Sequence, residues 1–144
     1  MALLMPLQIF NTTRKPLPEA LLGRLVEGVL AAEGFTPVDV VAVYCGKKMI
    51  RSINREFLQH DYATDTITFR YSDASEAGIE GEFYISLDVV EENARRFGTD
   101  GLQELLRVSV HSALHLIGYD DRTEEERRLM QEKEEYYLAR LPVR

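Results

Sequence analysis

The chain reads VSVHSALHLIGYDD from residue 108 to residue 121. Its first ten residues are apolar on nearly every side of a helix, which predicts a helix buried on most of its surface. His111 and His115, two of the three histidines in the chain, lie in this segment. Residues four apart lie on one helix face with Cβ atoms about 6 Å apart, so both imidazoles can reach one ion.

A third candidate ligand follows directly after the predicted helix. Gly118 ends the helix and lets the chain turn back, so that Asp121 can approach the two histidines. Zinc accepts imidazole nitrogen and carboxylate oxygen, and three protein ligands leave a fourth position for water. The spacing therefore predicts one zinc ion per chain, bound by His111, His115 and Asp121. The alternative is that both histidines are neutral core residues and that Asp121 belongs to an acidic turn.

Short alternating strands and helices are expected along the rest of the chain. Alternating apolar positions and β-branched runs predict strands at 7–11, 38–45, 66–71 and 82–87, the last two as an antiparallel pair. Helical periodicity and capping residues predict helices at 18–33, 46–58, 88–98, 100–117 and 123–138. We expect one α+β domain over residues 1–144, in which a mixed sheet of about four strands packs with about five helices.

Composition narrows the compartment and the mode of binding. Cys45 is the single cysteine and ends an apolar run, which favours a buried thiol in the reducing cytoplasm. The apolar run at residues 1–7 is interrupted by Pro6 and is too short to cross a bilayer, so we expect no membrane association. Lys and Arg total 17 against 24 Asp and Glu, a net charge of -7, so any RNA contact must use a local basic patch or a metal.

The predicted helix at 46–58 carries such a basic patch. Its apolar residues fall on one face, whereas Lys48, Arg51 and Arg55 fall largely on another. These three residues are candidates for substrate binding, because the helix leads directly towards the loop at 61–64. A solvated helix face is an equally good interpretation.

Two long stretches resemble the YbeY family of bacterial endoribonucleases. The family signature His-Gly-x-Leu-His-Leu-x-Gly-Tyr-Asp-His resembles residues 111–121. A second signature, Asn-x-x-Tyr-Arg-x-x-Asp-x-x-Thr-Asp-Val-Leu-Ser-Phe, resembles residues 54–69, and the strand Gly-Asp-Ile-x-Ile-Ser resembles residues 81–86. Together the similar stretches span roughly residues 40–135.

The resemblance implies a function as well as a fold. It implies a single α+β domain with a mixed sheet, a zinc site at His111, His115 and Asp121, and cleavage of single-stranded RNA. The expected role is maturation of 16S ribosomal RNA of the small subunit and ribosome quality control. Expected partners are ribosomal RNA, small ribosomal subunit proteins and the Era GTPase.

Three departures from the family pattern bear on activity. Asp121 stands at the usual third histidine, Ser112 stands for glycine, and Leu58 stands for an arginine thought to hold the scissile phosphate. Leucine offers no bidentate anion contact. A non-catalytic, zinc-stabilised ribosome-assembly factor is therefore the second hypothesis. A zinc peptidase of the His-Glu-x-x-His kind ranks last, because Ser112 stands where its general base would be.

Three further residues near the matching motifs are candidates for supporting roles. His60 is expected in a surface or loop-capping role. Asp65 and Glu82 are candidates for orienting a ligating histidine, with capping or turn roles equally favoured. No residue is predicted as the general acid or base.

Overall fold

The computed structural model describes residues 5–61 and 63–141, so part of the apolar run at 1–7 lies outside the described residues. The strands are β1 (Leu7–Asn11), β2 (Thr36–Cys45), β3 (Thr66–Arg70) and β4 (Gly78–Ser86). The helices are α1 (Glu19–Ala32), α2 (Lys47–Leu58), α3 (Leu87–Phe97), α4 (Gly101–Leu116) and α5 (Glu124–Ala139). The predicted α+β class is confirmed.

The four strands form one mixed sheet in the order β1-β2-β4-β3. β1 and β4 both pair with β2 in parallel, and β3 pairs with β4 antiparallel, as expected. β4 begins four residues before its predicted start, because Gly78 and Gly81 lie inside the strand and not in the turn before it. A Cβ at Gly81 would lie 2.5 Å from the Phe69 carbonyl oxygen, so this glycine permits a close approach of β3.

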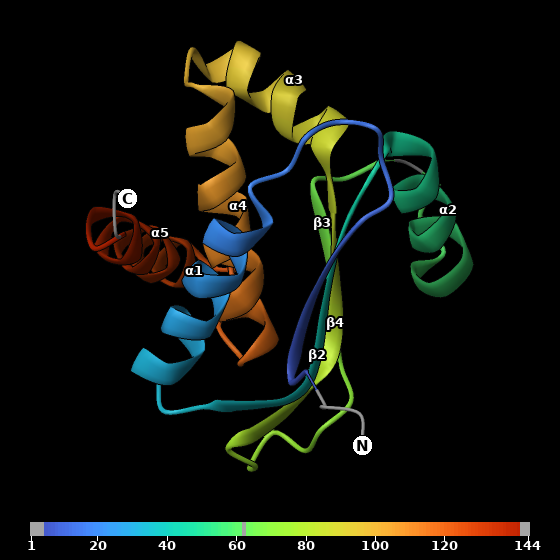
Figure 1. Cartoon of the computed structure of the whole chain (residues 1–144). Coiled ribbons are helices and arrows are strands. Elements are labelled where there is room, and N and C mark those ends of the chain that lie inside the picture. The colour runs from blue at the N-terminus through green and yellow to red at the C-terminus, as the bar shows by residue number, and fades with distance from the viewer. Residues whose placement is uncertain (1–4, 62, 142–144) are drawn as a thin grey trace.

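Helices cover the two faces of the sheet unequally. α1 and α4 pack on one face and α2 lies on the other, as Figure 1 shows. Ile79, Phe83 and Ile85 of β4 point into the larger core with α1 and α4. A smaller core beneath α2 contains Val43, Ile50, Ile67 and Cys45, so the predicted burial of the single thiol is confirmed.

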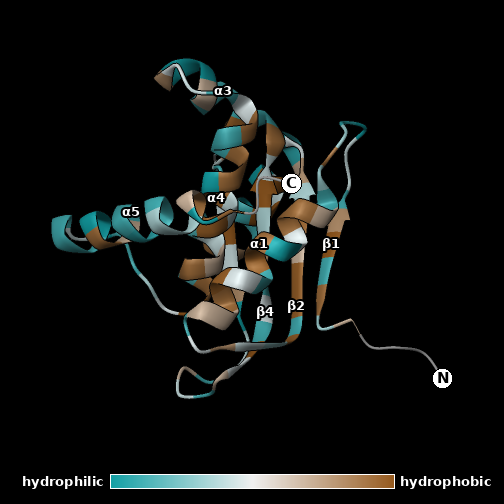
Figure 2. Ribbon diagram, turned by 60° about the vertical axis from the view of Figure 1, so that its left-hand side comes forward, coloured by the Kyte–Doolittle hydropathy of each residue, from teal (hydrophilic) through white to brown (hydrophobic). Residues whose placement is uncertain are grey.

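α4 is the central helix of the larger core. It packs against α1, α3, α5 and the strands β3 and β4. Figure 2 shows α4 as mostly hydrophobic and α5, on the outside, as mostly hydrophilic. No helix in the described part of the chain is long and apolar enough to cross a membrane.

Two buried serines fix α4 against the sheet. The Ser109 hydroxyl is 2.8 Å from the Tyr44 hydroxyl of β2, and the Ser112 hydroxyl is 2.7 Å from the Thr66 hydroxyl of β3. Each serine also donates a hydrogen bond to the backbone carbonyl four residues earlier. These bonds satisfy the buried hydroxyls and hold the histidine-bearing turns of α4 in a defined register on the sheet.

Candidate metal centre

The structure brings the three predicted ligands together. His111 and His115 lie one turn apart on α4, with ring centroids 5.5 Å apart, and Asp121 approaches from the loop after the helix. His111 Nε2 is 3.4 Å from Asp121 Oδ2, and His115 Nε2 is 3.7 Å from Asp121 Oδ1. One ligand atom from each residue falls within a span of 4.8 Å, so the cluster can hold a metal ion.

The donor set and its spacing fit zinc. Ligands that bind zinc tetrahedrally at about 2.0–2.2 Å lie roughly 3.3–3.6 Å from one another. The two imidazole-to-carboxylate distances, 3.4 Å to Oδ2 and 3.7 Å to Oδ1 of Asp121, are close to that separation, and one ligand atom from each residue lies within 4.8 Å of the others. Two imidazole nitrogens and one carboxylate oxygen are also donors that zinc accepts with an open fourth position.

The loop that carries Asp121 is held at both ends. Gly118 has a positive φ of 112°, which turns the chain back after α4. The Tyr119 hydroxyl donates to the carboxylate of Glu33, the C-cap residue of α1, at 2.6 Å. Arg127 of α5 donates to the backbone carbonyls of Asp121 and Arg122 at 3.4 and 2.8 Å. The loop that carries the Asp121 carboxylate is therefore held by contacts to Glu33, at the end of α1, and to Arg127 of α5.

Glu33 is the anchor that α1 supplies to this loop. Its carboxylate also accepts hydrogen bonds from Tyr137 and, at 3.0 Å, from Lys133, both on α5. Burial on its own raises the pKa of Glu33, but the bonds from Tyr119, Tyr137 and Lys133 bring that pKa below its ordinary value. The ionised carboxylate thus ties α1, α5 and the ligand loop together.

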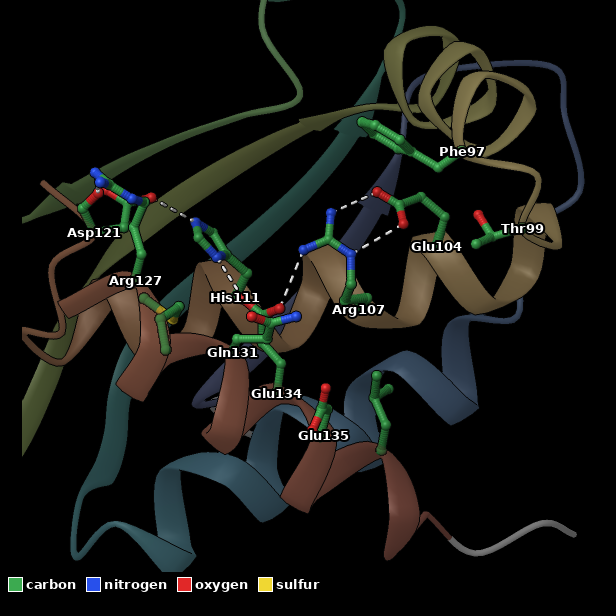
Figure 3. A pocket seen from close by; sticks show the side chains of 12 residues that line it. Phe97, Thr99, Glu104, Arg107, His111, Asp121, Arg127, Gln131, Glu134 and Glu135 are labelled. Carbon is green, nitrogen blue, oxygen red and sulfur yellow. Dashed lines mark hydrogen bonds and ion pairs between the residues drawn. The ribbon is translucent and has the colours of Figure 1, made fainter. Parts of the chain in front are cut away.

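His111 has a carboxylate partner that the sequence analysis missed. Its Nδ1 lies 2.7 Å from Glu134 Oε2 on α5, and Arg107 contacts the other oxygen of Glu134 (Figure 3). Burial lowers the pKa of His111, but the hydrogen bond to Glu134 and the charges of Glu134 and Asp121 raise it above its ordinary value. A glutamate on the buried face of α5, between Met130 and Tyr137, was the available signal in the sequence.

Asp65 and Glu82, the two candidates for orienting a ligating histidine, lie in different surroundings. Glu82 points to the opposite face of the sheet, where its carboxylate accepts hydrogen bonds from Tyr71 and Tyr84 at 2.9 and 3.0 Å. The prediction that Glu82 orients a ligating histidine is therefore wrong. Asp65 lies close enough to His111 for its charge to raise the pKa of that imidazole.

Two cavities flank the cluster. One, of about 450 Å³, lies between α4 and α5 and reaches His111 and Asp121. The other, of about 430 Å³, reaches His115 and is lined by polar residues of the α2–β3 connection, including His60 and Thr64. His60 is exposed, as expected. An ion at the cluster would therefore be accessible from two sides.

Leu58, at the position of the family's arginine, lines the second cavity. It does so together with His115, so an arginine at this position would be near the cluster. The cations that line this cavity are Arg70 and Arg122. Arg70 donates to the Ser72 hydroxyl and to two backbone carbonyls of the turn at 73–76. Its guanidinium is therefore already hydrogen-bonded to that turn.

The predicted basic patch lies outside this cavity. Arg51 donates to Asp61 at 3.0 Å and Arg55 lies 3.8 Å from the same carboxylate, and all three groups are exposed. Lys48 is exposed on the same helix. Substrate binding by Lys48, Arg51 and Arg55 stays a prediction, whereas Arg122 lines the cavity that His115 also lines.

Fold and site together define a small α+β protein with a three-ligand candidate metal centre at the end of a buried helix. The sequence model of the family described as Endoribonuclease YbeY matches residues 8–142. The protein named Endoribonuclease YbeY from Chlorobium limicola is 73% identical over 136 residues, which are 94% of this chain and 93% of that protein. The protein of the same name from Chlorobaculum parvum is 59% identical over 137 residues, or 95% of this chain and 96% of that protein.

A solved structure agrees with this result. The solution structure of TM1509 from Thermotoga maritima superposes with a TM-score of 0.64 at 29% identity, covering 92% of this chain and 86% of that one. The chain belongs to the YbeY endoribonuclease family. Membership supports an endoribonuclease, and the family resemblance predicted from the two sequence motifs is confirmed.

Proposed function

We propose that the chain is a zinc-dependent endoribonuclease that cleaves single-stranded RNA in the maturation and quality control of 16S ribosomal RNA. The observation that carries this proposal is the cluster of His111, His115 and Asp121, which opens onto a cavity with an arginine on its wall. As partners we propose ribosomal RNA, small ribosomal subunit proteins and the Era GTPase, and as compartment the cytoplasm.

The residues of the cluster have distinct parts in this proposal. His111, His115 and Asp121 would hold the ion, and their two neutral imidazoles and one carboxylate leave a single positive charge on the occupied site. A bound zinc ion would supply an activated water and neutralise charge that develops on the phosphodiester. Arg122 lines the same cavity as His115, and in this proposal its guanidinium would contact a phosphate oxygen.

The peptidase hypothesis is disfavoured by the position of Ser112. This residue is fully buried on the sheet-facing side of α4, and its hydroxyl is used by Thr66 and by the Val108 carbonyl. It neither faces the cluster nor can act as a base at neutral pH. A protease with its base directly after the first histidine therefore has no counterpart here.

The assembly-factor hypothesis has one observation in its favour. Leu58 is 43% exposed and lines the cavity without offering a hydrogen bond to phosphate. In that case the ion would only fix the loop at 118–121 against α4, and RNA would be bound without being cut. The two hypotheses differ in whether RNA is cleaved at the cluster.

Cleavage of small-subunit ribosomal RNA by the zinc-loaded chain, beside an identically purified His115→Ala variant, tests the proposal. We expect cleavage by the parent and its loss in the variant, because the variant lacks one of three ligands. Circular dichroism of both proteins checks that the variant keeps its fold. Equal cleavage by both would indicate a contaminating nuclease. No cleavage by either would move the conclusion to the assembly factor.

A further inference from the structure

A line of charged side chains connects His111 to the interface between α4 and α5 (Figure 3). Glu134 Oε2 lies 2.7 Å from His111 Nδ1, and Glu134 Oε1 accepts a hydrogen bond from Arg107 at 3.1 Å. Arg107 also donates two hydrogen bonds to Glu104, at 3.0 and 2.5 Å. The four residues form a continuous network that ends at a candidate metal ligand.

The carboxylates of this network are removed from water. Glu134 is 5% exposed and Glu104 is 4% exposed, whereas the Arg107 side chain between them is 37% exposed. Buried carboxylates need compensating partners, because desolvation of an unpaired charge is costly. One guanidinium shared by two carboxylates leaves one negative charge, and that charge lies at the end of the network that faces His111.

The imidazole of His111 is used at both nitrogens. Nδ1 faces Glu134, and Nε2 faces Asp121 in the cluster at 3.4 Å. An ionised carboxylate can only accept a hydrogen bond, so Nδ1 must carry the proton, and in the neutral imidazole Nε2 then presents its lone pair. Among the described residues, His115 has no hydrogen bond at Nδ1, so the network fixes one of the two histidines.

We propose that Glu134 is a positioning residue that fixes the orientation and the tautomer of His111, so that Nε2 is the atom offered to the metal. Arg107 and Glu104 in turn fix Glu134. This inference rests on the metal-binding part of the proposed function. It assigns a role in the site to a helix that supplies none of the three candidate ligands.

Stability alone does not account for a carboxylate at this position. Glu134 lies on the buried face of α5 with Met130 and Tyr137 on either side. Replacing a buried charge in such a place by an apolar residue is often neutral or stabilising, provided that no partner is left unpaired. Without Glu134, Arg107 would still have Glu104 as its partner, and the group that loses its partner is the uncharged Nδ1–H of His111. The carboxylate is therefore expected to matter more for metal binding than for folding.

Metal affinity tests the proposal in three variants. Zn²⁺ binding to metal-free protein is measured by competition with a chromophoric chelator for the parent, Glu134→Leu, Glu134→Gln and Glu135→Gln. We expect binding about 100-fold weaker in Glu134→Leu and about tenfold weaker in Glu134→Gln, whose amide still accepts a hydrogen bond. Glu135→Gln is the matched control, because Glu135 is exposed, lines the same cavity and contacts none of the three ligands. Its affinity should equal that of the parent.

Urea unfolding of the metal-free proteins separates positioning from folding. Glu134→Leu is expected to keep most of the parent's stability while its metal affinity falls. If that variant does not fold, the isosteric Glu134→Gln decides. The proposal is overturned if a folded Glu134→Leu or Glu134→Gln protein binds Zn²⁺ as tightly as the parent. It is also overturned if Glu135→Gln loses the same affinity.

A readout that needs no metal makes the two possible failures distinguishable. Long-range ¹H–¹⁵N spectra of the metal-free parent, at a pH above the imidazole titration, should show His111 protonated at Nδ1. The same spectra of Glu134→Leu should show a mixture of both tautomers. An unchanged tautomer in Glu134→Leu refutes the positioning role, whereas a parent that shows the expected tautomer and binds no Zn²⁺ refutes the metal part of the proposed function instead.

Discussion

Gly81→Ala should destabilise the fold, whereas Gly28→Ala should stabilise it, although the chemical change is the same. A Cβ at Gly81 would lie 2.5 Å from the Phe69 carbonyl oxygen, 2.8 Å from Leu116 Cδ1 and 3.2 Å from Arg70 Cα. Two of these three atoms are backbone of β3, so relief requires a shift of the strand. At Gly28, an exposed position in α1, the new methyl group would meet nothing within 4 Å.

The magnitudes follow from these contacts. Overpacking costs about 1–3 kcal/mol, and the upper part of that range applies at Gly81 because the clash involves backbone. The less flexible unfolded chain offsets about 0.4–1 kcal/mol of this cost, so we expect the free energy of unfolding to fall by roughly 2 kcal/mol. An unfolding entropy of about 2.1 cal/mol/K per residue converts this loss to a fall in Tm of roughly 7 °C. Gly28→Ala should raise stability by about 0.8–1.0 kcal/mol through helix propensity, a rise of roughly 3 °C.

Thermal unfolding by circular dichroism, with urea titration in parallel, measures both effects. A Gly81→Ala protein as stable as the parent would refute the reasoning. So would a change of the same sign in both variants, since the argument depends on the difference in surroundings.

Three further predictions concern single residues. Arg122→Ala should lower the affinity for single-stranded RNA and reduce the slope of log K against log salt by about 0.7. Arg51→Ala should change the affinity and the slope less. Equal effects of the two substitutions would contradict the proposed phosphate contact of Arg122. Glu33 has a pKa below its ordinary value of 4.5, so its contribution to stability is complete above about pH 4.5 and is lost as the pH falls through the lower folded pKa. Glu33→Gln should therefore destabilise at pH 7 and flatten the acid limb of a stability–pH curve. Burial raises the pKa of Cys45 to about 11, so a thiol reagent at pH 8 should modify it only as fast as the chain unfolds.

The cluster was predictable from sequence because its geometry is local. A spacing of four on a helix sets the separation of His111 and His115, and the glycine stop brings Asp121 back within a few residues. The N-cap residue Thr123 likewise lies within one turn of its partner Glu126, and the two residues form a complete capping box at the start of α5. Interactions within one or two turns of helix are determined by the sequence pattern itself.

The support around the cluster was not predictable in the same way. Glu134 reaches His111 across the α4–α5 interface, 23 residues along the chain, and no periodicity within one segment encodes that approach. The start of β4 was missed for a related reason. Gly78 and Gly81 have the composition of a turn, and only the proximity of Val38 and of β3 shows why the strand needs glycine there.

The electrostatics of the site connect two of its three departures from the family signature, Asp121 and Leu58. Asp121 in place of a neutral histidine lowers the charge of an occupied site by one, and Leu58 in place of arginine lowers the charge of the adjoining cavity by one. Both changes weaken the attraction for a phosphodiester, on a chain whose net charge is already -7. Arg122 follows the carboxylate ligand directly and restores one positive charge on the wall of the same cavity. RNA binding near the cluster should therefore depend on the bound ion and Arg122 together, so that losing either has a larger effect than it would in a site with three histidines and an arginine at position 58.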